Sequence, residues 1–157
     1  ADLRRRPVRV LGYGERSTAM GMTRWDDLTR TGAQEGAEEA YARAGITPAD
    51  VDVWQIYDSF SVTVALTLEE LGICDRGEAL DIVQDGVIRP GGSIALNTSG
   101  GGLSYCHPGQ LGILLLVEAV RQLRGEAGDR QIPDASVAVA HGTGGTFSTH
   151  ATVVLGV

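Results

Sequence analysis

The fold is decided by one glycine-rich stretch, Asn97-Thr98-Ser99-Gly100-Gly101-Gly102-Leu103-Ser104-Tyr105-Cys106-His107-Pro108-Gly109-Gln110-Leu111-Gly112. It joins a short apolar run at 93–96 to an apolar helical segment at 113–123. Three consecutive glycines let backbone N–H groups approach a ligand without obstruction by a Cβ atom. Proline is favoured in the first turn of a helix, so we expect His107, just before Pro108, to lie at a helix N-terminus. The helix dipole there favours neutral imidazole, which could take a proton or polarise a carbonyl.

The same stretch also fits a purely structural interpretation, in which a glycine turn is followed by a helix-capping histidine. A second glycine cluster, His141-Gly142-Thr143-Gly144-Gly145-Thr146, follows an apolar strand at 136–140 and precedes another at 151–155. Taken alone, this second cluster is typical of a hairpin turn. Two histidine-and-glycine turns that both follow strands nevertheless favour one shared site.

Both turns resemble segments of the thiolase superfamily. Residues 97–112 resemble its Asn-x-x-Gly-Gly … Gly-His-Pro-x-Gly segment, and residues 141–145 resemble its Cys-x-Gly-x-Gly loop with His141 in place of the cysteine. Tyr57-Asp58-Ser59-Phe60 is similar to the Asn-Glu-Ala-Phe box, and more similar to the His-Asp-Cys-Phe box of the sterol-carrier-protein thiolases. A thiolase subunit has two similar halves. The resemblance therefore implies that residues 1–157 form a C-terminal domain, with the N-terminal half of the fold absent from this chain.

Composition bounds the class of protein. The 157 residues are 43% hydrophobic and 21% charged, which predicts one globular domain. The net charge of −7 argues against nucleic acid as a partner. Two cysteines give no disulfide framework, which fits a reduced, cytoplasmic setting. No apolar run reaches the length of a membrane span.

Hydrophobic periodicity and turn residues predict an α/β fold. Strands are expected at 9–14, 51–56, 93–96, 136–140 and 151–155. Helices are expected at 31–44, 61–71 and 108–123, with a short one at 77–84. The resulting order is β-α-β-α-β-α-β-β. This order predicts a mostly parallel five-stranded sheet with helices on its faces and one antiparallel strand at the end.

Four residues are candidates for catalysis. The resemblance implies that His107 helps to bind the thioester oxygen, and His141 stands where ordinary thiolases have an acid/base cysteine. Tyr57 occupies the Asn or His position of the box, where a phenol could donate to an oxyanion or deprotonate a hydroxyl. A strand-end aromatic is the alternative interpretation of Tyr57. Tyr105 lies two residues before His107, so both side chains share a face if the segment is extended.

Gly101, Gly102 and Gly144 are the backbone donors expected to contact the acyl-CoA. Coenzyme A is expected only as part of the substrate, with no permanently bound cofactor and no metal. The resemblance also implies three protein partners: the N-terminal thiolase-like half, a second copy in a homodimer, and a small OB-fold protein.

The missing thiols bear on the reaction. Ser59 stands where the sterol-carrier variant has a cysteine, and His141 replaces the other acid/base thiol. Thiolysis needs a nucleophilic thiol and an acid/base thiol, whereas retro-aldol cleavage needs a base for a β-hydroxyl and donors for an enolate. We therefore expect a thiolase-like carbon–carbon lyase, similar to the aldolases that shorten steroid side chains, acting on a bulky 3-hydroxyacyl-CoA. The alternatives are a sterol-carrier-type thiolase and a non-catalytic scaffold or acyl-CoA-binding subunit.

Overall fold

The computed structural model describes residues 5–157, apart from the side chain of Met22. Its strands are β1 (Arg9–Ser17), β2 (Val53–Ile56), β3 (Val137–Gly144) and β4 (Thr149–Gly156). Its α-helices are α1 (Ala33–Ala44), α2 (Ser61–Glu70), α3 (Ala79–Gln84), α4 (Gly101–Ser104) and α5 (Leu111–Arg124). Short 3-10 turns occupy Met22–Arg24, Pro48–Asp50 and Gly128–Arg130. The predicted α/β class is confirmed, and the short helix expected at 77–84 is α3.

The sheet differs from the predicted five-stranded, mostly parallel one. It has four strands in the order β1-β4-β3-β2, and it is mixed. The β2–β3 pair is parallel, whereas β4 pairs antiparallel with both β1 and β3. The hairpin after β3 sends β4 back between β1 and β3, so the last strand of the chain lies inside the sheet and makes it mixed.

The run at 93–96, expected to be a strand, pairs with β2 through a single bridge between Trp54 and Leu96. Its ladder ends because Asn97 adopts a positive φ of 44°. The Asn97 side chain then takes over the pairing: Oδ1 accepts the N–H of Ile56 at 2.8 Å, and Nδ2 donates to the Ile56 carbonyl at 3.0 Å. A side-chain amide thus replaces the last rung of the expected strand.

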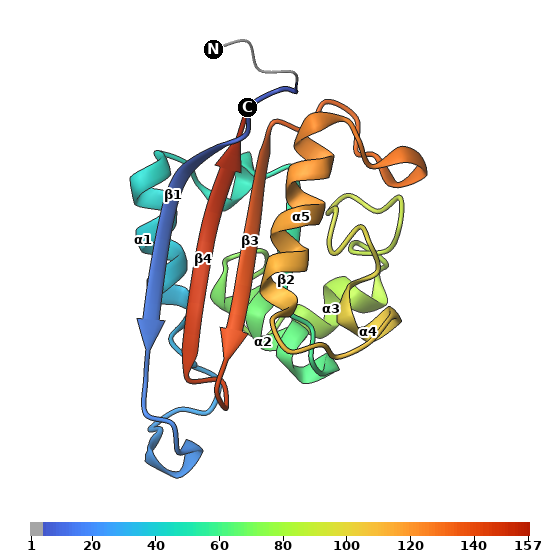
Figure 1. Ribbon diagram of the computed structural model, residues 1–157. Coiled ribbons are helices and arrows are strands. Elements are labelled where there is room, and N and C mark those ends of the chain that lie inside the picture. Colours follow the sequence, from blue (N-terminus) through green and yellow to red (C-terminus); the bar gives the residue numbers. More distant parts are fainter. Residues whose placement is uncertain (1–4) are drawn as a thin grey trace.

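Helices cover both faces of the sheet (Figure 1): α5 lies on one face, and α1 and α2 lie on the other. Side chains alternate along each strand, so Ala138 and Leu155 pack with α5, whereas Val139 and Val154 pack with α1. The α5 layer is mainly apolar, but it also holds the buried polar side chains of Glu118 and Gln122. The α1 layer also encloses a polar cluster.

Helix α1 lies unusually close to β1. A Cβ atom at Gly14 would stand 2.1 Å from the carbonyl oxygen of Gly36, and one at Gly12 would stand 2.2 Å from that of Ala40. Four of the buried residues of the helix are small, Ala33, Gly36, Ala37 and Ala40, and the fifth, Tyr41, meets Trp54 of β2 edge to face. Glycine on the strand and alanine on the helix therefore allow backbone-to-backbone contact.

The polar cluster contains two stacked imidazoles, His141 and His150, whose exposed fractions are 0% and 2%. His150 Nε2 lies 3.1 Å from the carbonyl oxygen of Phe147, which can only accept, so Nε2 carries the proton and Nδ1 is an acceptor. That Nδ1 lies 3.3 Å from Nε2 of His141, whose Nδ1 lies 2.8 Å from the Thr152 hydroxyl. A chain of hydrogen bonds from Thr152 to the Phe147 carbonyl therefore gives every ring nitrogen a partner, with both imidazoles neutral.

We predict that Gly14→Ala destabilises the protein by about 1–3 kcal/mol or more, because the new methyl group must push α1 away from β1. Gly142→Ala is the matched control, since a Cβ atom on this β3 glycine meets nothing within 4 Å. Urea titration of both variants measures the difference. Equal unfolding free energies for the two variants would contradict the close packing.

Stability should also fall as the pH drops from 7 to 5. Burial, and secondarily the nearby His150, lowers the pKa of His141 to about 3, and burial also lowers the pKa of His150. The unfolded chain takes up these protons below about pH 6.5, whereas the folded chain does not, so His141 alone costs about 1.4 kcal/mol for each pH unit below that value. Urea titrations at pH 7, 6 and 5 measure the slope. His141→Gln removes one titrating group and should flatten it; an unchanged slope in that variant would refute the assignment.

Candidate active site

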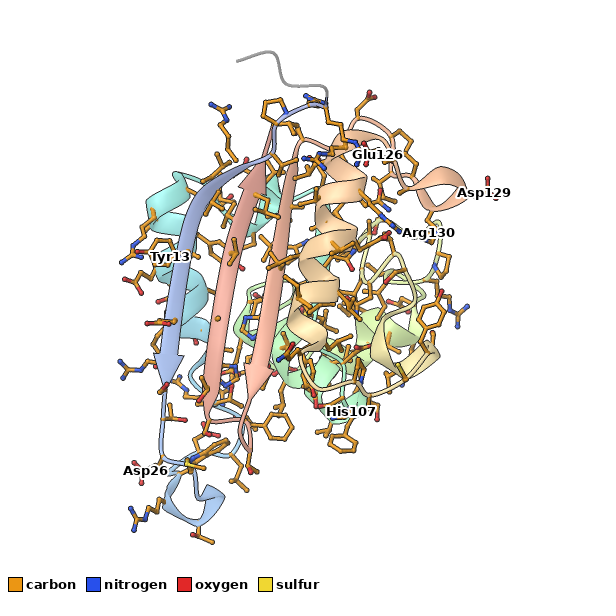
Figure 2. The ribbon with its side chains drawn as sticks, viewed as in Figure 1. Tyr13, Asp26, His107, Glu126, Asp129 and Arg130 are labelled. Atoms are coloured by element: carbon orange, nitrogen blue, oxygen red, sulfur yellow. The ribbon has the colours of Figure 1, made fainter. Side chains whose placement is uncertain are left out.

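The best candidate site is a solvent-open pocket of about 400 Å³ at the ends of β2 and β3. Its walls come from three parts of the sequence that lie far apart, and they include Tyr57, His107, Leu111, Gly142, Gly144 and Ala151. Figure 2 shows His107 at the end of the molecule toward which β1 and β3 run. This is the position where ligands of open α/β sheets gather.

Tyr57 and His107 form the polar centre of this pocket. The Tyr57 hydroxyl lies 3.2 Å from Nε2 of His107, and the two rings meet edge to face at 5.9 Å. Tyr57 follows β2 and packs against Leu111 and Leu115 of α5, so its ring is fixed while its hydroxyl reaches the pocket. The sequence-based prediction that these two residues share a site is consistent with this geometry.

The segment that carries His107 is held by a carboxylate to which the sequence reasoning assigned no role. Asp58 is 3% exposed, and its two oxygens accept the N–H groups of Gly102 at 2.8 Å and Leu103 at 3.1 Å. A Cβ atom at Gly101 would lie 2.2 Å from Asp58 Oδ2. The sequence did contain a signal for this contact. The box has an acidic residue, and the run of glycines offers free N–H groups that a carboxylate can bind.

This geometry bears on the glycines that were predicted to contact acyl-CoA. The N–H of Gly102 is occupied by Asp58, and the N–H of Gly101 lies 3.5 Å from Ser99 Oγ. Gly144 does line the pocket. The absence of a Cβ atom at Gly101 and Gly102 therefore makes room for the Asp58 carboxylate. Contact between these glycines and acyl-CoA stays a prediction.

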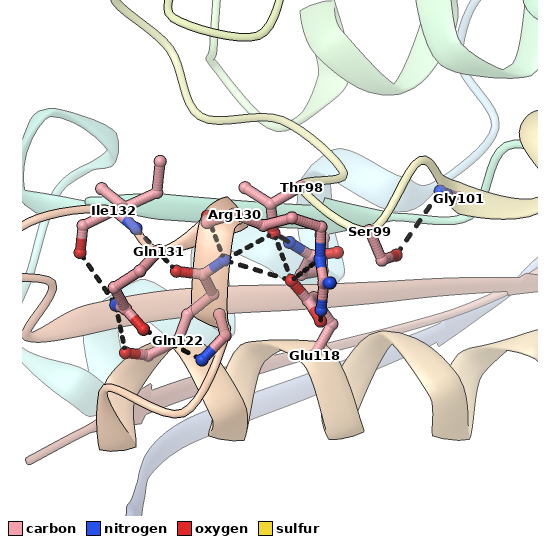
Figure 3. A network of polar contacts seen from close by, with 10 residues as sticks. Thr98, Ser99, Gly101, Glu118, Gln122, Arg130, Gln131 and Ile132 are labelled. Atoms are coloured by element: carbon pink, nitrogen blue, oxygen red, sulfur yellow. Dashed lines mark hydrogen bonds and ion pairs between the residues drawn. The ribbon is translucent and has the colours of Figure 1, made fainter.

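A second network holds the beginning of the same loop (Figure 3). The Glu118 carboxylate accepts hydrogen bonds from Thr98 at 2.8 Å and Gln122 at 3.1 Å, and it pairs with Arg130 at 3.0 Å. Burial alone would raise the pKa of Glu118, but hydrogen bonds from Arg130, Thr98 and Gln122 outweigh it and hold the pKa below its usual range. The loop is thus tied to α5 at Thr98 and to the end of β2 at Asn97.

Two of the predicted site residues lie elsewhere. Tyr105 is 75% exposed and follows the helical turn α4, so it is not extended and does not share a face with His107. The backbone of His141 meets the site, since its carbonyl accepts the N–H of Tyr57 at 2.9 Å. Its ring, however, points into the buried cluster under α1, on the opposite face of the sheet from α5. Strand alternation is the reason: Ala140 faces α5, so His141 faces away.

The expected helix start is also shifted. Helix α5 begins at Leu111, after Gln110 in a left-handed conformation with φ of 77°, so Pro108 is outside the first turn. His107 therefore lies before the first turn of α5, where the effect of the helix dipole is weaker. Its ring contacts the Tyr57 hydroxyl instead.

Ser59 and the two cysteines have different surroundings. Ser59 bonds to the hydroxyl of Thr63 at 3.0 Å. Burial, followed by nearby carboxylates, raises the pKa of the Cys74 thiol to about 11, while Cys106 is exposed. Across residues 5–157, no group of three or more His, Cys, Asp or Glu side chains could hold a metal ion. In this same range no helix has both the length and the apolar character needed to cross a bilayer.

Known proteins are similar to this chain in sequence and in fold. Residues 14–157 match the family described as thiolase C-terminal domain-like. An acetyl-CoA acetyltransferase of Methanothermobacter thermautotrophicus is 38% identical over 149 residues, which cover 92% of this chain and 39% of that protein. Sterol carrier protein 2 of Homo sapiens is 42% identical over 113 residues, covering 71% of this chain and 21% of that protein.

Two further relatives are described as a lyase and an aldolase. The 17-hydroxy-3-oxo-4-pregnene-20-carboxyl-CoA lyase of Mycobacterium tuberculosis is 44% identical over 108 residues, covering 68% of this chain and 27% of that protein. A solved structure described as an Ltp2-ChsH2(DUF35) aldolase superposes with a TM-score of 0.85 at 32% identity, covering 99% of this chain and 41% of that one.

This chain thus spans less than half the length of each of these relatives. The match to the family covers nearly all of the chain, and both the expected motifs and the fold agree with it. The chain belongs to the thiolase superfamily and corresponds to its C-terminal half.

Proposed function

We propose that this chain is the C-terminal half of a carbon–carbon lyase that cleaves a bulky 3-hydroxyacyl-CoA, with a steroid as the expected acyl group. The observation that carries the proposal is the hydrogen bond between Tyr57 and His107 at the open pocket. The lyase and aldolase relatives support it, as do Ser59, which replaces the cysteine of the sterol-carrier variant, and His141, which replaces the acid/base cysteine of ordinary thiolases.

In the proposed retro-aldol step, Tyr57 Oη accepts the proton of the substrate β-hydroxyl. The bond between the α and β carbons breaks and releases a ketone or aldehyde. Its electron pair becomes the enolate of the thioester. An ordinary phenol has a pKa of about 10, so free phenolate is scarce at neutral pH. In the proposal, free phenolate is not needed. As Tyr57 Oη accepts the proton of the substrate hydroxyl, Nε2 of His107 accepts the proton that Oη gives up.

The resulting imidazolium completes the proposed chemistry. Its positive charge stabilises the neighbouring enolate, as a positioned donor does for a developing oxyanion. Return of a proton to the α carbon gives the shortened acyl-CoA and restores the neutral pair. No thiol and no permanent cofactor enters these steps.

A sterol-carrier-type thiolase is the second candidate, supported by the acetyltransferase and sterol carrier protein 2 relatives. It would need a nucleophilic cysteine supplied by residues outside this chain. A non-catalytic acyl-CoA-binding subunit is the third. It would keep the pocket without depending on the Tyr57 hydroxyl.

The proposal includes partner proteins. Ile113, Leu114 and Val117 on the outer side of α5 are 57%, 51% and 44% exposed, an apolar stripe that fits a covering layer. We propose that the N-terminal thiolase-like half is that layer and that the complete subunit dimerises. The aldolase structure is by its description an assembly with a DUF35 protein, which supports a small OB-fold partner here. A cytoplasmic location accords with the unpaired Cys74 and Cys106.

Tyr57→Phe is expected to lower the cleavage rate by about 10²–10⁴-fold, because it removes the hydroxyl and keeps the packing of the ring. Tyr105→Phe is the matched control and should stay near the wild-type rate, since Tyr105 lies outside the pocket. The assay uses the complete enzyme and a 3-hydroxyacyl-CoA, and it measures released ketone or aldehyde without added CoA.

Three outcomes would redirect the assignment. A wild-type rate in Tyr57→Phe would remove Tyr57 as the base, and a loss confined to Tyr105→Phe would transfer that role. A strict need for free CoA, with two acyl-CoA products, would establish the thiolase instead.

A further inference from the structure

We propose that Asp58 is a positioning residue, which sets the distance between Tyr57 and His107 by clamping the loop that carries His107. The inference rests on the proposed function for its kinetic consequence. Its geometric part depends only on contacts in the structure. Asp58 directly follows Tyr57, so two consecutive residues at the end of β2 touch the same loop at two points.

The first contact is the clamp. Asp58 is 3% exposed, and both of its oxygens are used, by the N–H of Gly102 and the N–H of Leu103. The loop fits tightly around this carboxylate. A Cβ atom at Gly101 would overlap Oδ2 at 2.2 Å, and one at Gly102 would stand 3.0 Å from Oδ1. The carboxylate therefore fixes the backbone at 101–103.

The second contact is the hydrogen bond between Tyr57 and His107. His107 stands four residues beyond Leu103, and α5 begins only after Gln110, which has a left-handed conformation. Between the clamp and α5, the His107 ring contacts the hydroxyl of Tyr57. A shift of the clamp would therefore move His107 relative to Tyr57 Oη. Misplacement of a reacting group by about 1 Å can cost 10²-fold in rate.

Asp58→Asn tests the clamp, because the amide keeps one acceptor and turns a second donor toward the N–H of Leu103. We expect kcat to fall about 10–100-fold, while KM changes less than about threefold. In the Tyr57→Phe background the same substitution should lower kcat by less than about threefold, because the geometry that Asp58 sets no longer matters.

Asp52→Asn is the matched control. Asp52 stands at the start of β2, and its Oδ2 accepts the N–H groups of Ser136 at 2.8 Å and Val137 at 2.9 Å. The substitution removes the same kind of bond at the far end of the strand, so it should lower the thermal midpoint and leave kcat within about twofold of wild type. Equal kcat losses in Asp52→Asn and Asp58→Asn would make the role of Asp58 merely structural and overturn the proposal.

A readout independent of activity separates this inference from the proposed function. The imidazole Cε1–H signal of His107, assigned in the NMR spectrum with His107→Gln, should shift or broaden in Asp58→Asn and stay in place in Asp52→Asn. If Tyr57→Phe is fully active but the His107 signal moves in Asp58→Asn, the clamp stands and the lyase mechanism fails. An unmoved signal, or kcat losses that multiply in the double variant, overturns the clamp.

If Asp58→Asn does not fold, Gly102→Ala is the second variant that tests the clamp. Its methyl group stands 3.0 Å from Oδ1 of Asp58 and equally close to Cδ2 of Leu111, and it leaves the buried charge in place. The same pattern is expected: a lower kcat in the wild-type background, little further loss with Tyr57→Phe, and a displaced His107 signal. A variant with a wild-type kcat and an unmoved signal would refute the proposal.

Discussion

The candidate site depends on how the end of β2 holds the glycine-rich loop through side chains. Asn97 pairs its amide with both backbone groups of Ile56, and two residues later Asp58 receives the N–H groups of the loop. These bonds satisfy polar groups that a longer strand would otherwise have paired. The loop can therefore leave the sheet, pass the carboxylate and return to α5 with His107 facing Tyr57.

A second level of support lies beneath the loop. Thr98 bonds to the buried Glu118 of α5, which Arg130 and Gln122 hold in its charged form. A buried carboxylate is costly unless its partners are complete, and here three side chains meet it. Rigid support of this kind suits a site that must keep a donor and an acceptor at one distance.

The two faces of the sheet divide the polar residues between different tasks. On the α5 face, the pocket opens beside Tyr57 and His107. On the α1 face, His141 and His150 complete a chain of hydrogen bonds in which every donor meets an acceptor, and they are buried. A histidine at a motif position can thus contribute to the interior through its ring and to the site through its backbone carbonyl alone.

The sequence by itself determined the family, the α/β class and the helices near 31–44 and 61–71, and it named Tyr57 and His107 as candidates for one site. Glycine and histidine motifs and hydrophobic periodicity are local properties, so they are readable in one chain. Only the tertiary structure decided that β4 enters between β1 and β3, that 93–96 keeps one bridge, and that the ring of His141 faces α1. Strand order and the face of a side chain follow from pairing register, in which a shift of one residue turns every side chain over. Asp58 shows the same limit: its role depends on a loop that lies 44 residues away in sequence and in contact only after folding.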